Sequence, residues 1–246
     1  MIKIQNLSKS FKENLILDDI LLDINKSKIH FIIGVSGTGK TVLVKHIVGL
    51  LSPDKGEIIF DNVDITKLKE KEMKKIRKKI TYVFQHSTLF DNLTLYQNIE
   101  LPIVKMHGHA SQRDIKKEIK KYMKLVNIEE YQSKYPYELG ESIKKRTAIA
   151  RALAMNPEYI IYDEPTTGLT YSDARNIDNL IFEMSRKLNV TAIVISHDLE
   201  SIFSIADRIT MLHKGKILLD GTKKDFKNSK NEIINQFING NAEGPI

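Results

Sequence analysis

Short apolar runs, rich in isoleucine and leucine and bounded by polar residues, recur along this chain. They cover residues 2–5, 16–24, 29–33, 57–60 and 80–84 before the middle of the chain, and residues 159–163, 191–196 and 209–212 after Pro157. Runs of this length that end at turn residues predict β-strands.

Apolar residues at helical spacing fill much of the remaining chain. Residues 41–51, 111–126 and 172–188 show this spacing, and the pattern is helical throughout residues 87–157. Strands that alternate with helices predict an α/β sheet that is buried on both faces. The helical stretch in the middle predicts an inserted subdomain at about residues 87–157, so we expect a single domain over residues 1–246.

The composition limits which kinds of site the protein can have and where in the cell we expect it. The chain has no cysteine, which excludes disulfides and thiolate metal sites. The sequence after Met1 lacks the apolar core of a signal peptide, and no stretch approaches 18 consecutive apolar residues. We therefore expect a cytoplasmic protein that does not cross the membrane.

The net charge of +7 comes largely from lysines in residues 67–79, 116–124 and 223–230. Basic clusters can attract nucleic-acid phosphates. Acidic residues interleave all three clusters, however, and lysine-rich helices are usually solvated faces. We therefore predict no nucleic-acid partner, while a weak attraction to an anionic membrane leaflet fits the charge equally well.

The strongest chemical signal is a glycine-rich loop between a predicted strand and a predicted helix. It matches G-x-x-x-x-G-K-[ST], which requires that context. Its glycines let backbone N–H groups surround phosphate oxygens, and the helix N-terminus adds unpaired donors. The lysine supplies a charge for the β- and γ-phosphates, and the threonine hydroxyl ligates Mg²⁺. The loop, which predicts ATP or GTP binding, consists of Gly34, Val35, Ser36, Gly37, Thr38, Gly39, Lys40 and Thr41.

Two carboxylates, Asp163 and Glu164, end the apolar run at residues 159–163. The carboxyl ends of parallel strands form the ligand crevice of an open sheet, so this pair should lie beside the phosphate loop. We expect Asp163 to hold Mg²⁺ through water, and Glu164 to orient or deprotonate the attacking water.

Two further polar residues end neighbouring predicted strands. His197 follows the run at residues 191–196 and is a candidate to contact the γ-phosphate. Gln85 follows the run at residues 80–84 and is a candidate to contact both the metal ion and the attacking water. The other histidines, including His86, His107 and His109, carry no comparable signal.

In this order the motifs resemble those of the ABC ATPase family over nearly the full length. The resemblance implies a P-loop NTPase fold of ABC ATPase type, with an antiparallel β subdomain and an inserted helical subdomain. It also implies that Phe11 stacks on adenine and that two copies bind head to tail. Each ATP then lies between one phosphate loop and the partner's signature helix, which corresponds here to residues 139–146.

Within this family the chain resembles the ATPase subunits of MCE-linked, Mla-type lipid transporters. The resemblance rests on residues 89–95, 143–146 and 205–209 and on the ending at residues 236–238 and 243–246. It implies integral membrane permease partners, a lipid-binding MCE-type protein and a peripheral position at the cytoplasmic face of the inner membrane. Import of amino acids or metals uses nearly the same motor and stays an alternative.

The chain departs from the family pattern at two motifs. The family's Leu-Ser-Gly-Gly is replaced by Leu139, Gly140, Glu141 and Ser142, and Thr170 stands where an aspartate is expected. A carboxylate at about 5 Å from a phosphate charge costs roughly 3 kcal/mol at an effective dielectric constant of about 20, unless Glu141 turns away or pairs with a lysine. Ser142 is a candidate to replace the missing hydroxyl.

These departures leave two functions open. The first is an ATPase whose hydrolysis is reduced or depends more on its partners. The second is a structural or regulatory subunit that binds ATP and hydrolyses very little. We expect membrane helices to dock on the helical subdomain near residues 86–103, where Phe90, Leu93, Leu95 and Tyr96 predict an apolar patch; the alternative is that these residues form the subdomain core.

Overall fold

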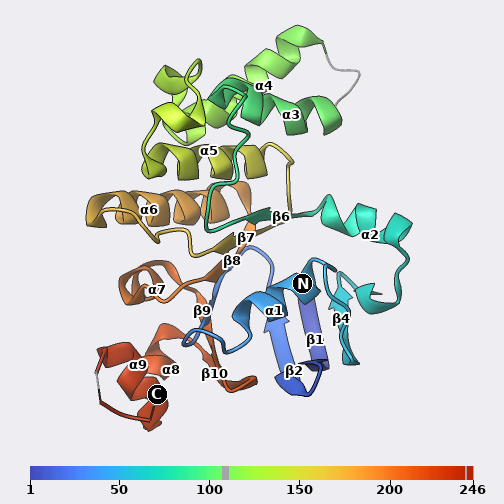
Figure 1. The fold of residues 1–246 in the computed structure, drawn as a ribbon, viewed down its shortest axis with the longest axis vertical. Helices are drawn as coiled ribbons and strands as arrows, with labels where there is room; N and C mark the ends of the chain where they lie inside the picture. Colours follow the sequence, from blue (N-terminus) through green and yellow to red (C-terminus); the bar gives the residue numbers. More distant parts are fainter. Residues whose placement is uncertain (107–110, 242, 246) are drawn as a thin grey trace.

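The computed structural model describes residues 1–106, 111–241 and 243–245. His107, His109 and Ile246, considered above, lie outside these ranges. Figure 1 shows the path of the chain, whose elements follow in order. The strands are β1 (Ile2–Phe11), β2 (Asn14–Ile24), β3 (Ile29–Ile33), β4 (Lys55–Phe60), β5 (Val63–Asp64), β6 (Ile80–Val83), β7 (Tyr159–Asp163), β8 (Thr191–Ile195), β9 (Arg208–His213) and β10 (Lys216–Gly221). The helices are α1 (Lys40–Ile47), α2 (Glu70–Arg77), α3 (Leu95–Met106), α4 (Gln112–Leu125), α5 (Glu141–Leu153), α6 (Tyr171–Leu188), α7 (Leu199–Ile205), α8 (Lys223–Lys227) and α9 (Glu232–Asn239), with short 3-10 turns at Ile65–Lys67, Glu129–Tyr131 and Pro136–Glu138.

Within the described residues the central sheet has six strands in the order β10-β9-β3-β8-β7-β6. All neighbours are parallel except β10, which pairs antiparallel with β9. The α/β prediction is therefore confirmed. The parallel pairing brings the carboxyl ends of β3, β6, β7 and β8 to one edge of the sheet, as predicted from the polar residues that follow these strands.

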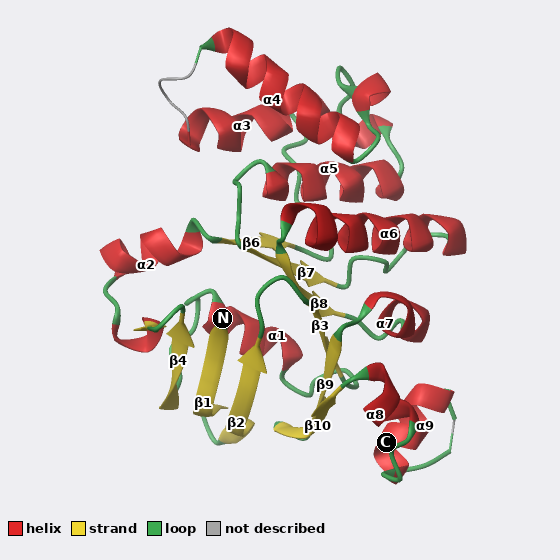
Figure 2. Ribbon diagram, turned by 180° about the vertical axis from the view of Figure 1, so that it is seen from behind, coloured by secondary structure: helices red, strands yellow, loops and turns green. Residues whose placement is uncertain are grey.

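Consecutive residues of the central strands enter different cores because side chains alternate across a sheet. Phe31 and Ile160 belong to one hydrophobic cluster, while their neighbours Ile32 and Ile161 belong to the other. The first cluster also contains residues of α3 to α9, and the second contains residues of α1, α2 and the antiparallel sheet. Figure 2 shows α6 and α1 on opposite sides of the central sheet. This two-sided burial explains why these strands read as continuous apolar runs.

The second sheet contains β2, β1, β4 and β5 in that order, and all its pairs are antiparallel. It bears out the antiparallel β part of the expected fold. Gly56 has φ +85°, and an added Cβ would lie 2.4 Å from the carbonyl oxygens of Gln5 and Asn6. Only glycine lets β1 and β4 approach this closely.

Helices α3, α4 and α5 form a layer above β6 and α6 (Figure 1). The loop before α3 is held by Asn98, whose buried side chain bonds the main chain of Phe90, Leu93 and Thr94. Pro102 lies inside α3. Throughout the described part of the chain, no helix is both long enough and apolar enough to cross a membrane.

The apolar pattern missed several elements. It gave no indication of α2, α7, α8, α9 or β10, because these are short or carry many charges. Strand β1 also runs to Phe11, well beyond the expected residues 2–5, through register shifts between Ile4 and Ser10. Such bulges interrupt the two-residue alternation on which strand prediction depends.

Candidate nucleotide-binding site

The predicted chemical residues converge at the carboxyl edge of the central sheet. The phosphate loop follows β3, Gln85 follows β6, Asp163 ends β7 and His197 follows β8. Asp163 is in register with Ile195 of β8, which in turn faces Ile32 of β3. The fold therefore brings together residues as far apart in sequence as Gly34 and His197.

The phosphate loop turns sharply at its glycines. Gly34, Gly37 and Gly39 have φ angles of +140°, +80° and +99°, which other residues rarely adopt. A Cβ on Gly34 would lie 2.3 Å from the Leu212 carbonyl oxygen, whereas a Cβ on Gly37 would meet no atom within 4 Å. Gly34 is thus required by the fold, while Gly37 faces open space.

Lys40 lies inside the loop it follows. Its Nζ donates hydrogen bonds to the carbonyl oxygens of Gly34 (2.7 Å) and Val35 (2.9 Å). Burial lowers the pKa of Lys40, and the charges of Glu164 and Asp163 oppose this shift. The ammonium group has carbonyl oxygens as its hydrogen-bond partners, and a polyphosphate would give it negatively charged ones. Thr38 closes the loop through a hydrogen bond to Val35, and Thr41 is exposed at the start of α1.

Asp163 is held by a residue that the sequence analysis missed. The Tyr82 hydroxyl donates a hydrogen bond of 2.7 Å to its Oδ2. Burial, followed by this bond, raises the pKa of Tyr82, so the phenol stays a donor at any physiological pH. A strand register would have been needed to predict the contact, because Tyr82 lies 81 positions before Asp163.

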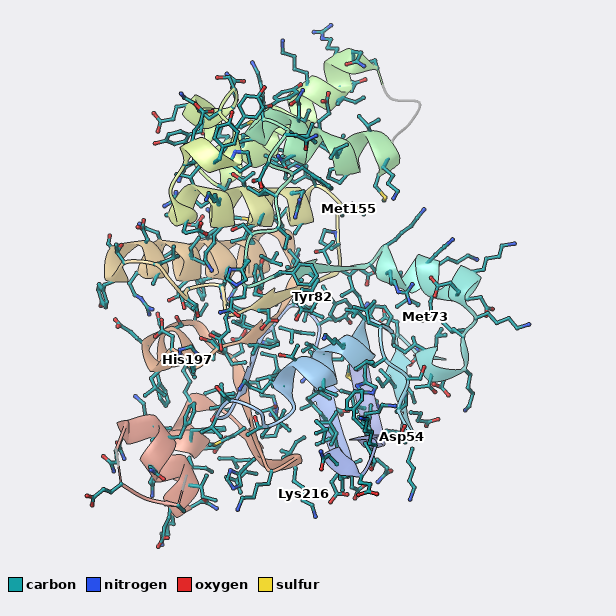
Figure 3. The ribbon with its side chains drawn as sticks, in the orientation of Figure 1. Asp54, Met73, Tyr82, Met155, His197 and Lys216 are labelled. Atoms are coloured by element: carbon teal, nitrogen blue, oxygen red, sulfur yellow. The ribbon has the colours of Figure 1, made fainter. Side chains whose placement is uncertain are left out.

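Glu164 has an unusual backbone and a defined partner. Its φ of +48° lies in the left-handed region, which is uncommon for a residue other than glycine. Its Oε1 lies 2.9 Å from Nδ1 of His197, and its Oε2 accepts a hydrogen bond from Thr167. His197, which Figure 3 labels, directly follows the end of β8 and is exposed. The two predicted catalytic residues therefore meet directly.

The loop of His197 is fixed by the next residue. Asp198 caps α7 by accepting hydrogen bonds from the N–H groups of Glu200 and Ser201. Its other oxygen pairs with Arg175 of α6, which also pairs with the buried Asp178 at 2.9 Å. The position of His197 thus depends on an ion-pair network that sequence spacing did not reveal.

The Gln85 side chain is exposed where the chain leaves β6. The main-chain carbonyl oxygen of Gln85 accepts a hydrogen bond of 3.1 Å from Lys145 of α5. Among the described residues, no hydrogen bond joins the Gln85 side chain to Asp163 or Glu164. Its role toward the metal ion stays a prediction.

Phe11 lies at the tip of the β1–β2 hairpin and is 43% exposed. Lys9 lies over this ring at 5.6 Å from the centroid. The same hairpin contacts the phosphate loop, since a Cβ on Gly39 would lie 2.8 Å from the Leu17 side chain. Stacking of adenine on Phe11 stays a prediction that this placement allows.

The departures from the family signature form their own contacts. Gly140 precedes α5 in open surroundings, and Glu141 pairs with Lys144 at 3.0 Å. This pairing is the condition under which the carboxylate interferes less with a nearby phosphate. Ser142 donates a hydrogen bond of 2.9 Å to Asp173 of α6.

Thr170, the second departure, meets the same carboxylate. It caps α6 by accepting from the Asp173 N–H, and its hydroxyl donates to the other Asp173 oxygen at 2.9 Å. These bonds, led by the one from Ser142, lower the pKa of Asp173. Both unusual motifs therefore converge on Asp173.

A groove of ≈ 400 Å³ opens between α2, β6, α3 and α5. Figure 3 labels Tyr82 and Met155, two of its lining residues. Phe84, Phe90 and Leu101 give it exposed apolar side chains, at 47%, 52% and 44% exposure. The predicted apolar patch was wrong in one respect: Leu95 is fully buried, as the alternative of a subdomain core predicted, in the cluster that includes residues of α3, α4 and α5. Leu93 and Tyr96 are partly buried.

The residues at the sheet edge suit Mg²⁺ bound with a nucleoside triphosphate. Among the described residues no group of three His, Asp or Glu side chains could hold a metal by itself. Mg²⁺ in phosphoryl-transfer sites takes one or two protein ligands, phosphate oxygens and water. Thr41, Asp163 and Gln85 offer that limited set of oxygens beside a loop whose open face at Gly37 admits phosphate.

Comparisons with known proteins agree with this geometry. A family model described as ABC transporter matches residues 17–167. The intermembrane phospholipid transport system ATP-binding protein MlaF of Haemophilus influenzae is 35% identical over 246 residues, covering 100% of this chain and 93% of MlaF. The methionine import ATP-binding protein MetN of Carboxydothermus hydrogenoformans is 35% identical over 243 residues, covering 97% of this chain and 72% of MetN.

Two solved structures are similar over most of the chain. The dimeric ATP-binding cassette MJ0796 in a post-hydrolysis state, bound to ADP and Pi, has a TM-score of 0.82 at 30% identity and covers 90% of this chain and 98% of its own. The structure of cbiO1 from Clostridium perfringens, part of the transporter complex cbiONQ, has a TM-score of 0.86 at 30% identity, covering 98% of this chain and 95% of its own.

Proposed function

Because the chain belongs to the ABC transporter family, whose ATPase domains bind ATP with Mg²⁺ and energise transport, we propose that it drives phospholipid transport through membrane permease subunits. The observation that carries the hydrolytic part is the 2.9 Å contact between Glu164 and His197 beside the phosphate loop. The phospholipid part is supported by the full-length similarity to MlaF.

In the proposed mechanism each residue of the sheet edge has one task. The phosphate loop and Lys40 bind the β- and γ-phosphates. Thr41, Asp163 and Gln85 would hold Mg²⁺ directly or through water, and the bound ion would supply charge neutralisation of the phosphates. Glu164 orients the attacking water and accepts its proton, and His197 holds the Glu164 carboxylate in place.

The second copy completes the proposed site. In a head-to-tail homodimer, Gly140, Glu141 and Ser142 of one copy face the γ-phosphate bound by the other. The Glu141–Lys144 pair reduces the repulsion that a free carboxylate would exert. Ser142 must leave Asp173 to donate to phosphate, so we expect hydrolysis slower than with an intact signature.

The test is ATP turnover by the complex assembled with its permease in membranes. Lys40→Ala should abolish ATP binding, and Glu164→Gln should abolish turnover while ATP still binds. Stimulation of this turnover by phospholipid, and not by amino acids or metal ions, would support the lipid assignment. Stimulation by methionine instead would favour the small-solute importer suggested by the similarity to MetN.

The altered signature favours a second candidate, a nucleotide-binding regulatory subunit with little hydrolysis. Restoring the signature separates the two. The combined variant Gly140→Ser, Glu141→Gly, Ser142→Gly and Thr170→Asp should turn over ATP much faster than the wild type if the motif limits the rate. No change would show that the natural signature is not impaired.

The proposed permease site is the groove beside Gln85, at which the protein would be held to the cytoplasmic face of the inner membrane. Its apolar lining and the Arg151 guanidinium suit a short amphipathic helix of the permease. Phe90→Asp should prevent co-purification of the permease, whereas Phe182→Asp, an exposed phenylalanine on α6, should not. Equal recovery with both variants would contradict this docking site.

A further inference from the structure

Lys145 is a buried lysine in the second turn of α5, and only 4% of it is exposed. Its Nζ donates to two main-chain carbonyl oxygens, those of Gln85 (3.1 Å) and Glu164 (3.3 Å). Burial lowers its pKa, and the charges of Glu141 and Glu164 oppose that shift. Buried ammonium groups are usually paired with carboxylates at short range, so a lysine held by carbonyl dipoles gains little stability from its charge.

The contact at Glu164 falls on a strained residue. Glu164 has φ +48°, and its carbonyl oxygen accepts from both Lys145 and the Thr167 N–H (3.3 Å). A left-handed conformation of this kind costs on the order of 1 kcal/mol or more and persists where surrounding contacts enforce it. Lys145 is one of those contacts, and it acts on the residue whose carboxylate meets His197.

The contact at Gln85 belongs to a longer attachment of its loop to α5. Two turns further along the helix, Arg151 donates to the carbonyl oxygens of Ser87 and Thr88. Ser87 and Thr88 line the groove, and Arg151 is part of its wall. The loop that joins the groove to the nucleotide site is therefore held by two cations of one helix, and only Lys145 also reaches Glu164.

We infer that Lys145 is a positioning residue for ATP hydrolysis, which ties the Gln85 loop and the Glu164 backbone to α5 so that the Glu164 carboxylate is held in its working orientation. This inference rests on the proposed function. This role depends on the Lys145 ammonium group and its two acceptors, the carbonyl oxygens of Gln85 and Glu164, and not on contact between Lys145 and the nucleotide.

The experiment compares Lys145→Met, Lys145→Arg and Lys120→Met in the membrane-assembled complex. Methionine keeps the apolar stem without the charge, arginine keeps a cationic donor, and Lys120 is an exposed lysine on α4. ATP binding, the thermal midpoint, kcat and KM are measured for each, beside the wild type and Glu164→Gln.

We expect Lys145→Met to lower kcat about 10- to 100-fold, the loss that a small misplacement of a catalytic group produces. ATP affinity and KM should change by less than about threefold, and the thermal midpoint should stay equal or rise, because an unpaired buried charge is removed. Lys145→Arg should recover most of kcat, and Lys120→Met should match the wild type.

An unchanged kcat in Lys145→Met, or a loss that follows a fall in the folded fraction, would overturn the inference while leaving the proposed function intact. Failure of arginine to recover any activity lost in the methionine variant would also overturn it. Wild-type turnover no greater than that of Glu164→Gln would overturn the proposed function, and the inference with it.

Discussion

The hydrogen bond from Tyr82 to Asp163 leads to a specific expectation for Tyr82→Phe. The substitution removes one hydroxyl and leaves the ring, which lies 4.5 Å from Phe84 between centroids. A hydrogen bond to a charged group contributes about 1.5–3 kcal/mol. Because Tyr82 is only half-buried, we take the lower part of this range, which corresponds to about a tenfold change in an equilibrium or rate constant. Removal of a residue that orients a metal ligand typically lowers metal affinity or activity 10- to 100-fold.

The assay is steady-state ATP turnover as a function of Mg²⁺ concentration. We expect Tyr82→Phe to need about tenfold more Mg²⁺ for half-maximal turnover, with a smaller loss at saturating Mg²⁺. The matched control is Tyr131→Phe, on the 3-10 turn Glu129–Tyr131 that follows α4. In an Asp163→Asn background, Tyr82→Phe should have no further effect. An unchanged Mg²⁺ dependence, or additive effects of the two substitutions, would refute the reasoning.

Three further predictions concern the supports of the site. Arg175→Met leaves the buried Asp178 without its cation and should lower the free energy of unfolding, measured by urea denaturation, by about 3 kcal/mol. Recovery of stability on adding Asp178→Asn would confirm the cause, and an unchanged urea midpoint in Arg175→Met would contradict it. Burial lowers the pKa of His30 to about 4, so its neutral form stabilises the fold above about pH 6.5, and up to about 3 kcal/mol is lost as the pH falls through 4. Unfolding of the wild type should therefore show a steeper pH dependence than His30→Gln over this window, and equal slopes would exclude the effect. Gly37→Ala should fold but bind ATP weakly, whereas Gly34→Ala should fail to fold well, since its Cβ meets the Leu212 carbonyl; circular dichroism and nucleotide binding distinguish the two, and equal folding would contradict the assignment.

The parts of the site that could be predicted from sequence depend on local chemistry. The phosphate loop is contiguous, and its glycines and Lys40 act through their own backbone. Asp163 and His197 could be placed because each ends an apolar strand, and parallel strands bring such ends together. The fold class followed from the same alternation of strands and helices.

The remaining contacts depend on residues that are far apart in sequence. Tyr82 reaches Asp163 across 81 positions, and Arg175 reaches Asp198 across 23, so neither has a local pattern. Lys145 was considered only within residues 143–146 of the family resemblance, and nothing in its local sequence indicates that its side chain is buried. Leu95 was predicted to belong to an apolar patch because it is one of several apolar residues near Gln85, with the subdomain core as the alternative; its burial depends on how α3 packs, which the sequence pattern does not show.

Asp173 has a consequence for how two nucleotides communicate. It binds Ser142, which in the proposed homodimer faces the ATP of the partner copy, and it also binds Thr170, which follows the loop of its own copy's Glu164. A movement of Thr170 on hydrolysis in one site would change the hydrogen bonding of a residue that serves the other. The two sites would then hydrolyse ATP in alternation or in concert rather than independently. The dependence of turnover on ATP concentration would have a Hill coefficient different from one.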